Sequence, residues 1–180
     1  MALKVLLVDD SPAVRLTLRS GLVRIGVDRS RVFEAEDAAT AMRLFRKVHP
    51  EVVFMDLSLK PRVEAGEPPK REPDAVLTPA EPVEQGEVLA KQMLYQDPSV
   101  KLVVCTGVPA DSASVQEVVK YGAFCVLQKP VTLQQIHRVF QVLAAEGLML
   151  STSGPFNDRR ARSAGETPTR PRPTWDEETP

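Results

Sequence analysis

The hydrophobic pattern of the chain alternates between short continuous apolar runs and stretches with apolar residues at helical spacing. Five runs predict buried strands, at residues 3–8, 31–35, 51–56, 100–106 and 123–129. The segments between and after them carry apolar residues three or four positions apart, which indicates amphipathic helices. Apolar residues throughout each strand suit a parallel sheet that is covered on both faces. The alternation therefore predicts an α/β fold, a doubly wound five-stranded parallel sheet.

Local signals mark where several of these helices begin and end. Ser11 is an expected N-cap, and Pro12 follows it at the first helical position. The second helix is expected to stop before Pro50, and the fourth near Gly122. These signals predict compact strand–helix units with short connections.

Two segments break the alternation. Residues 57–85 are rich in proline and charge and have no periodicity, which predicts a long loop inserted after the third strand, with regularity resuming at Gly86. A tolerated loop is the plainer interpretation, because long loops cost little closure entropy, and a lid or partner-docking element is the alternative. Residues 149–180 predict a disordered C-terminal tail, which leaves residues 1–148 as the folded domain.

Composition narrows the classes of function. The 180 residues favour one domain, and a net charge of −1 gives no electrostatic case for nucleic acid or an anionic membrane. No apolar stretch approaches the ~18 residues of a membrane span. Cys105 and Cys125 lie in apolar runs and predict buried free thiols in a cytoplasmic protein, with a disulfide or reactive thiol as the alternative. His49 and His137 are isolated and predict surface or helix-end positions.

Polar residues collect where the predicted strands end. Asp9 and Asp10 follow the first strand, Asp56 ends the third, Thr106 the fourth, and Lys129 the fifth. Each alone has a plain explanation, as a helix cap, a loop residue or a solvated lysine. If the strand order is 2-1-3-4-5, however, the three carboxylates converge at the switch point of the sheet, where ligands bind in such folds.

Three neighbouring carboxylates repel one another unless a cation balances their charge. Two unit charges 4 Å apart repel by about 4 kcal/mol at an effective dielectric of 20. Mg²⁺ prefers oxygen ligands and typically uses one or two carboxylates together with phosphate oxygens. We therefore predict that Asp9 and Asp10 hold Mg²⁺ beside Asp56.

These residues and their surroundings resemble the receiver domain of two-component response regulators. The matching pieces are LLVDDSPAVRLTLRSGL, VVFMDLSL, GEVLAKQM, LVVCTG and GAFCVLQKP. The resemblance implies a flavodoxin-like, CheY-like fold with the strand order 2-1-3-4-5. It also implies that Asp56 accepts a phosphoryl group from the phosphohistidine of a histidine kinase or a histidine phosphotransfer protein.

The resemblance also assigns roles around the phosphoacceptor. Asp10 would bind Mg²⁺ directly, Asp9 would act largely through a coordinated water, and the backbone carbonyl of Ser58 would complete the protein ligands. Lys129 would pair with the phosphoryl oxygens, and the Thr106 hydroxyl would donate a hydrogen bond to one of them.

The chain also departs from the family pattern. The position three residues before Lys129 is usually aromatic and here is Val126, and strand alternation predicts that Phe124 shares its face, farther from the site. Pro61 follows the phosphoacceptor one place later than in the usual loop. By analogy, the peptide before Pro130 is expected to be cis.

The expected output is contact with another protein. No second folded domain, DNA-binding domain or catalytic output domain is evident, which predicts a stand-alone regulator and not an enzyme, acting through residues 111–143 on an unknown target. One alternative is a receiver-like scaffold that works without phosphorylation. Another is an aspartyl phosphatase of the haloacid dehalogenase type, in which the acidic pair comes late in the chain, whereas here it comes first.

Overall fold

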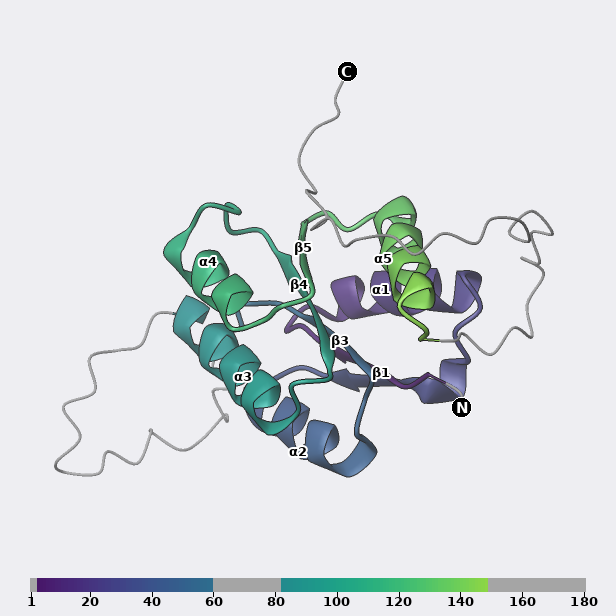
Figure 1. Ribbon diagram of the computed structural model, residues 1–180, viewed down its shortest axis with the longest axis horizontal. Coiled ribbons are helices and arrows are strands. Elements are labelled where there is room, and N and C mark those ends of the chain that lie inside the picture. The colour runs from purple at the N-terminus through teal and green to yellow at the C-terminus, as the bar shows by residue number, and fades with distance from the viewer. Residues whose placement is uncertain (1–2, 60–81, 149–180) are drawn as a thin grey trace, which may run out of the picture.

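The computed structural model describes residues 3–59 and 82–148 and confirms the predicted sheet (Figure 1). Five parallel strands lie in the order β2-β1-β3-β4-β5. They are β1 (Val5–Val8), β2 (Val32–Ala35), β3 (Val52–Met55), β4 (Lys101–Thr106) and β5 (Cys125–Gln128). Because β1 lies between β2 and β3, the switch point of the sheet falls beside β1. This is the strand order under which the acidic residues after β1 and β3 were expected to lie close together.

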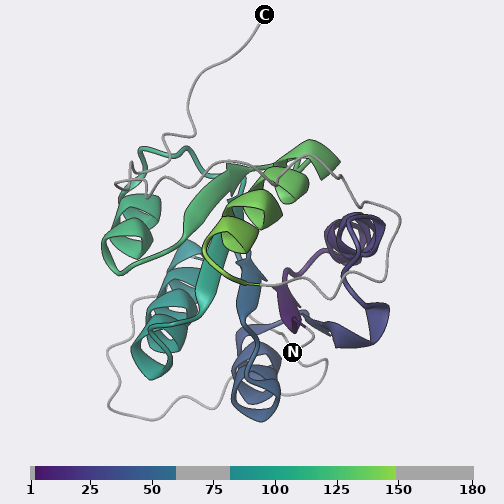
Figure 2. The same ribbon diagram turned by 45° about the vertical axis from the view of Figure 1, so that its right-hand side comes forward.

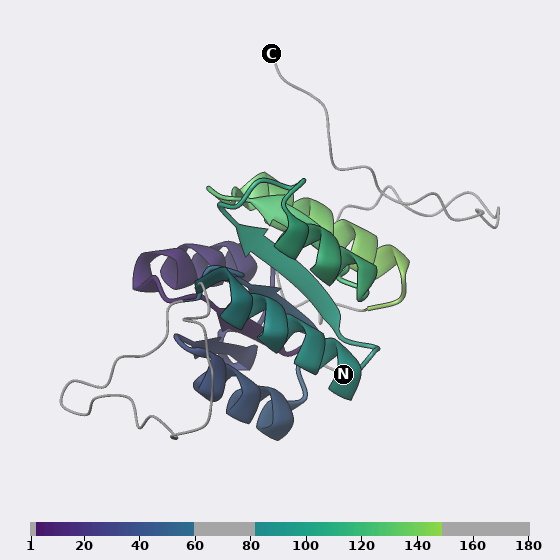
Figure 3. The same cartoon turned by 90° about the vertical axis from the view of Figure 1, so that its left-hand side faces the viewer.

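Helices cover both faces of the sheet. They are α1 (Pro12–Arg24), α2 (Ala38–Val48), α3 (Pro82–Gln96), α4 (Ala113–Lys120) and α5 (Leu133–Ala145), with a short 3₁₀ helix, η1 (Arg29–Arg31), before β2. Helices α1 and α5 pack on one face, in purple and green in Figure 2, and α2, α3 and α4 on the other (Figures 2 and 3). The strands are therefore buried from both sides, which explains their continuous apolar runs.

Alternation along each strand divides the core into two clusters. In β1, Leu6 and Val8 point toward α2 and α3, whereas Val5 and Leu7 point toward α1 and α5. All four β1 residues are buried, as are all four of β3. The two central strands thus form a rigid base from which Asp9 and Asp56 emerge.

The helix boundaries follow the local sequence with one difference. The Ser11 side chain accepts a hydrogen bond from the backbone N–H of Val14 at 3.5 Å, and α2 ends in a left-handed residue, His49, just before Pro50. Helix α3, however, begins at Pro82 and not at Gly86, so residues 82–85 of the expected loop are helical. Proline is compatible with the first turn of a helix. The proline-rich sequence around Pro82 has no helical periodicity, so it gave no signal that the helix begins there.

Other parts of the expected loop and tail lie outside the described residues. Leu57 and Leu59, at the start of the expected insertion, are fully buried in the cluster under α2 and α3, so they belong to the folded domain. Residues 60–81 of that insertion, which include Pro61, and the tail of residues 149–180 lie outside the described ranges. Within the described ranges, no helix has the length and apolar character of a membrane span.

Gly86 generates a prediction about stability. A Cβ on Gly86 would lie 2.5 Å from the carbonyl carbon of Leu57, because α3 packs directly against the backbone that follows β3. We expect Gly86→Ala to destabilise the fold by about 1–3 kcal/mol through overpacking, although the same change in an open helix interior stabilises by roughly 0.5–1 kcal/mol. Urea unfolding of the two proteins measures the difference.

Gly107→Ala is the matched control for that experiment, since nothing lies within 4 Å of a Cβ built there. Its free energy of unfolding should stay close to that of the unchanged protein. A Gly86→Ala protein at least as stable as the unchanged one would contradict the close approach of α3 to Leu57.

The two cysteines generate a second prediction. Cys105 and Cys125 are free thiols, 1% and 5% exposed, in the cluster under α1 and α5. Burial raises the pKa of Cys125 to about 12 and that of Cys105 well above its ordinary value, so neither forms a reactive thiolate near pH 8. We expect an aromatic disulfide reagent to leave both thiols unmodified in the folded protein and to titrate both in guanidinium. Rapid stoichiometric reaction without denaturant would show that the thiols are accessible.

Candidate functional site

The site forms where two central strands end side by side. In the parallel pair of β1 and β3, Val8 lies opposite Met55, so the next residues, Asp9 and Asp56, leave the sheet at neighbouring points. The backbone N–H of Asp56 still donates to the carbonyl of Val8 at 2.9 Å, which extends the ladder to the site itself. Strand register therefore brings together two carboxylates that are far apart in the sequence.

The three predicted carboxylates do converge. One oxygen from each of Asp9, Asp10 and Asp56 lies within 4.8 Å of the others. Asp9 is 1% exposed and Asp56 4%, whereas Asp10 is half-buried. The cluster is therefore buried at Asp9 and Asp56 and accessible to solvent at Asp10.

Lys129 is the cation of the cluster. Its ammonium lies 2.6 Å from Asp56 Oδ2, to which it donates a hydrogen bond, and 2.8 Å from Asp9 Oδ2. Its backbone N–H donates to the carbonyl of Thr106 at 2.9 Å, which anchors the end of β5 to the end of β4. The peptide between Lys129 and Pro130 is cis, as predicted.

Backbone N–H groups orient the two buried carboxylates. Asp9 Oδ1 accepts from the N–H of Ser11 at 2.8 Å, and Asp56 Oδ1 accepts from the N–H of Ser58 at 3.0 Å. Both are local turns in which an aspartate side chain bonds two residues ahead. Each turn occupies one oxygen and leaves Oδ2 directed at Lys129.

Burial and ion pairing shift the pKa values of Asp9 and Lys129 in opposite directions. Burial raises the pKa of Asp9, even though the Lys129 ammonium and the N–H of Ser11 favour its ionised form. Burial would lower the pKa of Lys129, but its contacts with Asp56 and Asp9 outweigh burial and raise it. Burial and ion pairing therefore act in opposite directions on both pKa values: burial prevails at Asp9, and the contacts with the carboxylates prevail at Lys129.

The site has the donor set of a divalent cation. With all three carboxylates ionised, one ammonium leaves the cluster with a net charge of −2. Asp9 Oδ2 is buried and makes no hydrogen bond among the described residues, although Lys129 is within ion-pair distance. Hard oxygen donors with uncompensated negative charge are what Mg²⁺ prefers, so the residues fit that ion.

The remaining predicted site residues lie around this cluster. Thr106 is fully buried at the end of β4, and its hydroxyl oxygen accepts from the N–H of Val108 at 3.1 Å. Ser58 is half-buried and lies two residues after Asp56, and the role of its carbonyl as a ligand stays a prediction. The predicted residues thus occupy one edge of the sheet.

The expectation for Phe124 was wrong. Val126 packs with the cluster under α2, α3 and α4, whereas Phe124 packs with the opposite cluster, under α1 and α5. Its ring lies 5.4 Å from the ammonium of Lys101. Phe124 precedes the first residue of β5, so strand alternation does not apply to it. It therefore cannot substitute for the aromatic residue that Val126 replaces.

Arg15 supports the site, although its role was not predicted from the sequence. Its guanidinium donates to the backbone carbonyl of Asp9 at 2.6 Å and contacts Glu34 on β2 at 3.3 Å. Arg19, one turn later, also contacts Glu34, at 2.9 Å. The sequence did contain a signal for these ion pairs: Arg15 and Arg19 lie four residues apart on a predicted helix, and Glu34 is an acid inside an otherwise apolar strand. The network ties α1 and β2 to the backbone of the site.

Comparison with known proteins supports the family resemblance. No family model matches the chain. The chemotaxis protein CheY of Thermotoga maritima is 25% identical over 130 residues, which cover 72% of this chain and 88% of that protein. A protein-glutamate methylesterase/protein-glutamine glutaminase of Anaeromyxobacter dehalogenans is 29% identical over 131 residues, but the match covers only 30% of its length.

Solved structures share the fold. A CheY-like response regulator receiver domain protein from Methanospirillum hungatei superposes with a TM-score of 0.62 at 18% identity, covering 81% of this chain and 96% of that one. CheY4 of Vibrio cholerae superposes with a TM-score of 0.57 at 22% identity, covering 79% and 98%. Together with the sheet order, the acidic cluster and the sequence likeness to CheY, these matches show that the described part of the chain has the fold of CheY-like response regulator receiver domains.

Proposed function

We propose that the chain is a phosphorylation-controlled signalling module in which Asp56 accepts the phosphoryl group. The observation that carries this proposal is the placement of Asp56. It is a buried carboxylate with one oxygen fixed by the N–H of Ser58 and the other beside Lys129, next to two further acids. A carboxylate oriented in this way is suited to nucleophilic attack on phosphorus.

In the proposed step, Asp56 Oδ2 attacks the phosphorus of a phosphohistidine. The new oxygen–phosphorus bond forms as the nitrogen–phosphorus bond breaks, and the imidazole nitrogen leaves with the electron pair and takes up a proton. The Lys129 ammonium, 2.6 Å from the attacking oxygen, then faces the oxygens of the transferred group. The Thr106 hydroxyl, at the neighbouring strand end, is the proposed second donor.

Mg²⁺ is the proposed cofactor, held by Asp9, Asp10, the phosphoacceptor and the Ser58 carbonyl. When bound, it neutralises charge on the transferring phosphoryl group, which is the main requirement of this chemistry. The chain's own contribution is positioning. The backbone of Asp9 is held by Ala35 at 3.2 Å and Arg15 at 2.6 Å, so the site does not need to be assembled by the ligand.

Protein contacts are the proposed means of input and output. The proposed donor is a histidine kinase or a histidine phosphotransfer protein in the cytoplasm, and the proposed readout surface comprises residues 111–143. A full reversal of a two-state equilibrium requires about 5.5 kcal/mol of differential stabilisation. New contacts of a doubly charged phosphoryl group with a cation and an ammonium are the proposed source of this energy.

A receiver-like scaffold that acts without phosphorylation is the second candidate, and the packing of Val126 favours it. This half-buried side chain lies in the core cluster where the family usually has an aromatic ring. The enzymatic activity named for the methylesterase relative belongs to that protein, of which this chain matches 30%, and we propose no such activity here. Unchanged partner binding by Asp56→Asn would favour the scaffold.

Phosphorylation gives the direct test. We expect acetyl phosphate with Mg²⁺ to add one phosphoryl group to the protein at Asp56, detected by mass spectrometry of the intact chain and its peptides. Asp56→Asn should lose the adduct completely, because an amide cannot act as the nucleophile. Glu51→Gln is the charge-matched control at the opposite edge of the sheet and should label normally. The proposal fails if a reference receiver domain labels and this protein does not.

Metal binding gives a separate test. Mg²⁺ at one hundred times its dissociation constant should raise the free energy of unfolding by about 2.7 kcal/mol. Asp10→Asn removes a proposed ligand, and a tenfold loss of affinity would reduce that gain to about 1.4 kcal/mol at the same concentration. Thermal unfolding with and without Mg²⁺ measures both, with Glu51→Gln as the control. Equal gains in the Asp10 and Glu51 variants would place the ion elsewhere.

A further inference from the structure

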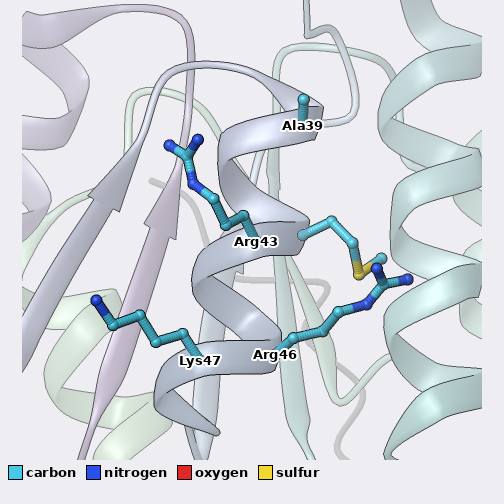
Figure 4. A pocket seen from close by; sticks show the side chains of 5 residues that line it. Ala39, Arg43, Arg46 and Lys47 are labelled. Atoms are coloured by element: carbon cyan, nitrogen blue, oxygen red, sulfur yellow. The ribbon is translucent and has the colours of Figure 1, made fainter.

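Helix α2 carries a surface that the proposed phosphorylation chemistry does not use. Two depressions, of about 530 and 400 Å³, open on it, and both are lined by Ala39 and Met42, so they form one continuous groove. We call it the α2–α3 groove. Its basic end adds Arg43, Arg46 and Lys47 (Figure 4). Its other end reaches α3 and adds Ala38, Gln85, Val88, Leu89 and Gln92.

The basic end of the groove is not neutralised within the described part of the chain. None of the described lining residues is acidic, and Arg43, Arg46 and Lys47 form no ion pair with residues 3–59 or 82–148. Arg46 donates only to the neutral amide of Gln96, at 3.3 Å. Since the whole chain carries a net charge of −1, three unpaired cations on one helix are a local excess that suits an anionic occupant.

The shape of the groove specifies the occupant further. Arg43 and Lys47 extend to one side of α2, and Arg46 extends to the other side, toward α3 (Figure 4). The apolar lining comes from Met42, which both depressions share, and, on α3, from Val88, which is 53% exposed. The groove therefore fits a segment with one large apolar side chain and carboxylates close by.

The tail contains one segment with this composition. Trp175 is the single tryptophan of the chain, and Asp176, Glu177 and Glu178 follow it directly. Residues 173–180 hold these three acids and no lysine or arginine, whereas the arginines of the tail lie upstream. An aromatic anchor with adjacent carboxylates is complementary to a groove that is lined by both apolar side chains and cations.

The tail also starts at the edge of the sheet where the strands begin, which is the edge next to the basic end of the groove. Leu148, the last described residue, follows α5, and nearby Glu146 pairs with Lys101 at the first position of β4, at 2.8 Å. Lys4, just before β1, donates to the carbonyl of Val48 at the end of α2, at 2.8 Å. Because parallel strands begin at one edge, the tail leaves the domain at the edge where the basic end of the groove lies.

The connecting chain is long enough. A flexible segment of the length of residues 149–174 has a root-mean-square span of about 28 Å. Neighbouring strands are ~4.8 Å apart and packed layers are ~10 Å apart. A few strand widths and the passage from the α5 face of the sheet to its α2 face therefore separate the two positions. A tether of this kind gives an effective concentration on the order of millimolar, which makes even a weak contact populated.

We propose that residues 175–178 dock in the α2–α3 groove of the same chain, with the Trp175 ring over Met42 and Val88 and the three carboxylates beside Arg43, Arg46 and Lys47. This interaction surface is separate from the acidic cluster and does not rest on the proposed function. Contact is made by reversible burial of one aromatic ring and by charge pairing at the exposed rim, so it weakens with ionic strength.

The single tryptophan makes the proposal measurable in the full chain. We expect Trp175 emission to be blue-shifted, and its quenching by acrylamide to be reduced, relative to a synthetic peptide of residues 173–180. The charge reversals R43E/R46E/K47E should return both values to those of the peptide. The reversals R24E/R29E/R138E, at three exposed cations on other elements, are the matched control and should leave the docked spectrum unchanged.

Two further measurements and one outcome of the peptide comparison test the groove and its occupant. Val88→Asp changes an exposed side chain of the groove, so the protein should stay folded by circular dichroism while the blue shift is lost. A blue shift that disappears on dilution would overturn intramolecular docking in favour of the tail of a second copy. Emission and quenching equal to those of the free peptide would overturn the proposal and leave the groove to an acidic partner protein.

Discussion

The arrangement of the site depends on one ammonium placed between two buried carboxylates. Lys129 is 2.6 Å from Asp56 Oδ2 and 2.8 Å from Asp9 Oδ2, at the meeting point of strands that are otherwise wholly apolar. Without this cation, the acids at the ends of β1 and β3 would repel each other in a medium of low dielectric. One ammonium compensates only part of that charge, and the excess negative charge is what the proposed divalent ion would balance.

The sheet supplies the rigidity that such a cluster needs. The register of β1 and β3 sets the separation of Asp9 and Asp56, and Arg15 and Glu34 hold the Asp9 backbone from α1 and β2. Gly86 allows α3 to approach the backbone of Leu57, the residue after Asp56. Helix α3 therefore contacts the segment that follows Asp56, and Leu57 of that segment belongs to the core cluster under α2 and α3. These contacts are a physical route by which the site and the core cluster can be coupled.

The described surface presents two regions of opposite charge. The acidic cluster lies at the carboxyl ends of the strands, whereas the cations of the α2–α3 groove lie along α2, with Lys47 one residue before its end at the opposite edge. Separation of the two regions means that occupation of one does not directly neutralise the other. The proposed phosphoryl chemistry and the proposed docking of the tail therefore use different elements of the same fold.

Much of the fold was determined by the sequence alone. Continuous apolar runs fixed the strands as buried on both faces, and the positions of Asp9, Asp10, Asp56, Thr106 and Lys129 at strand ends located the site, because parallel strands end at one edge. Local patterns could not identify Arg15 as a support of Asp9, or place Phe124 on the face opposite Val126. They also missed the first turn of α3, which begins inside a proline-rich segment. Those features depend on contacts between elements distant in the chain, and only tertiary packing decides which of several locally acceptable positions a side chain takes.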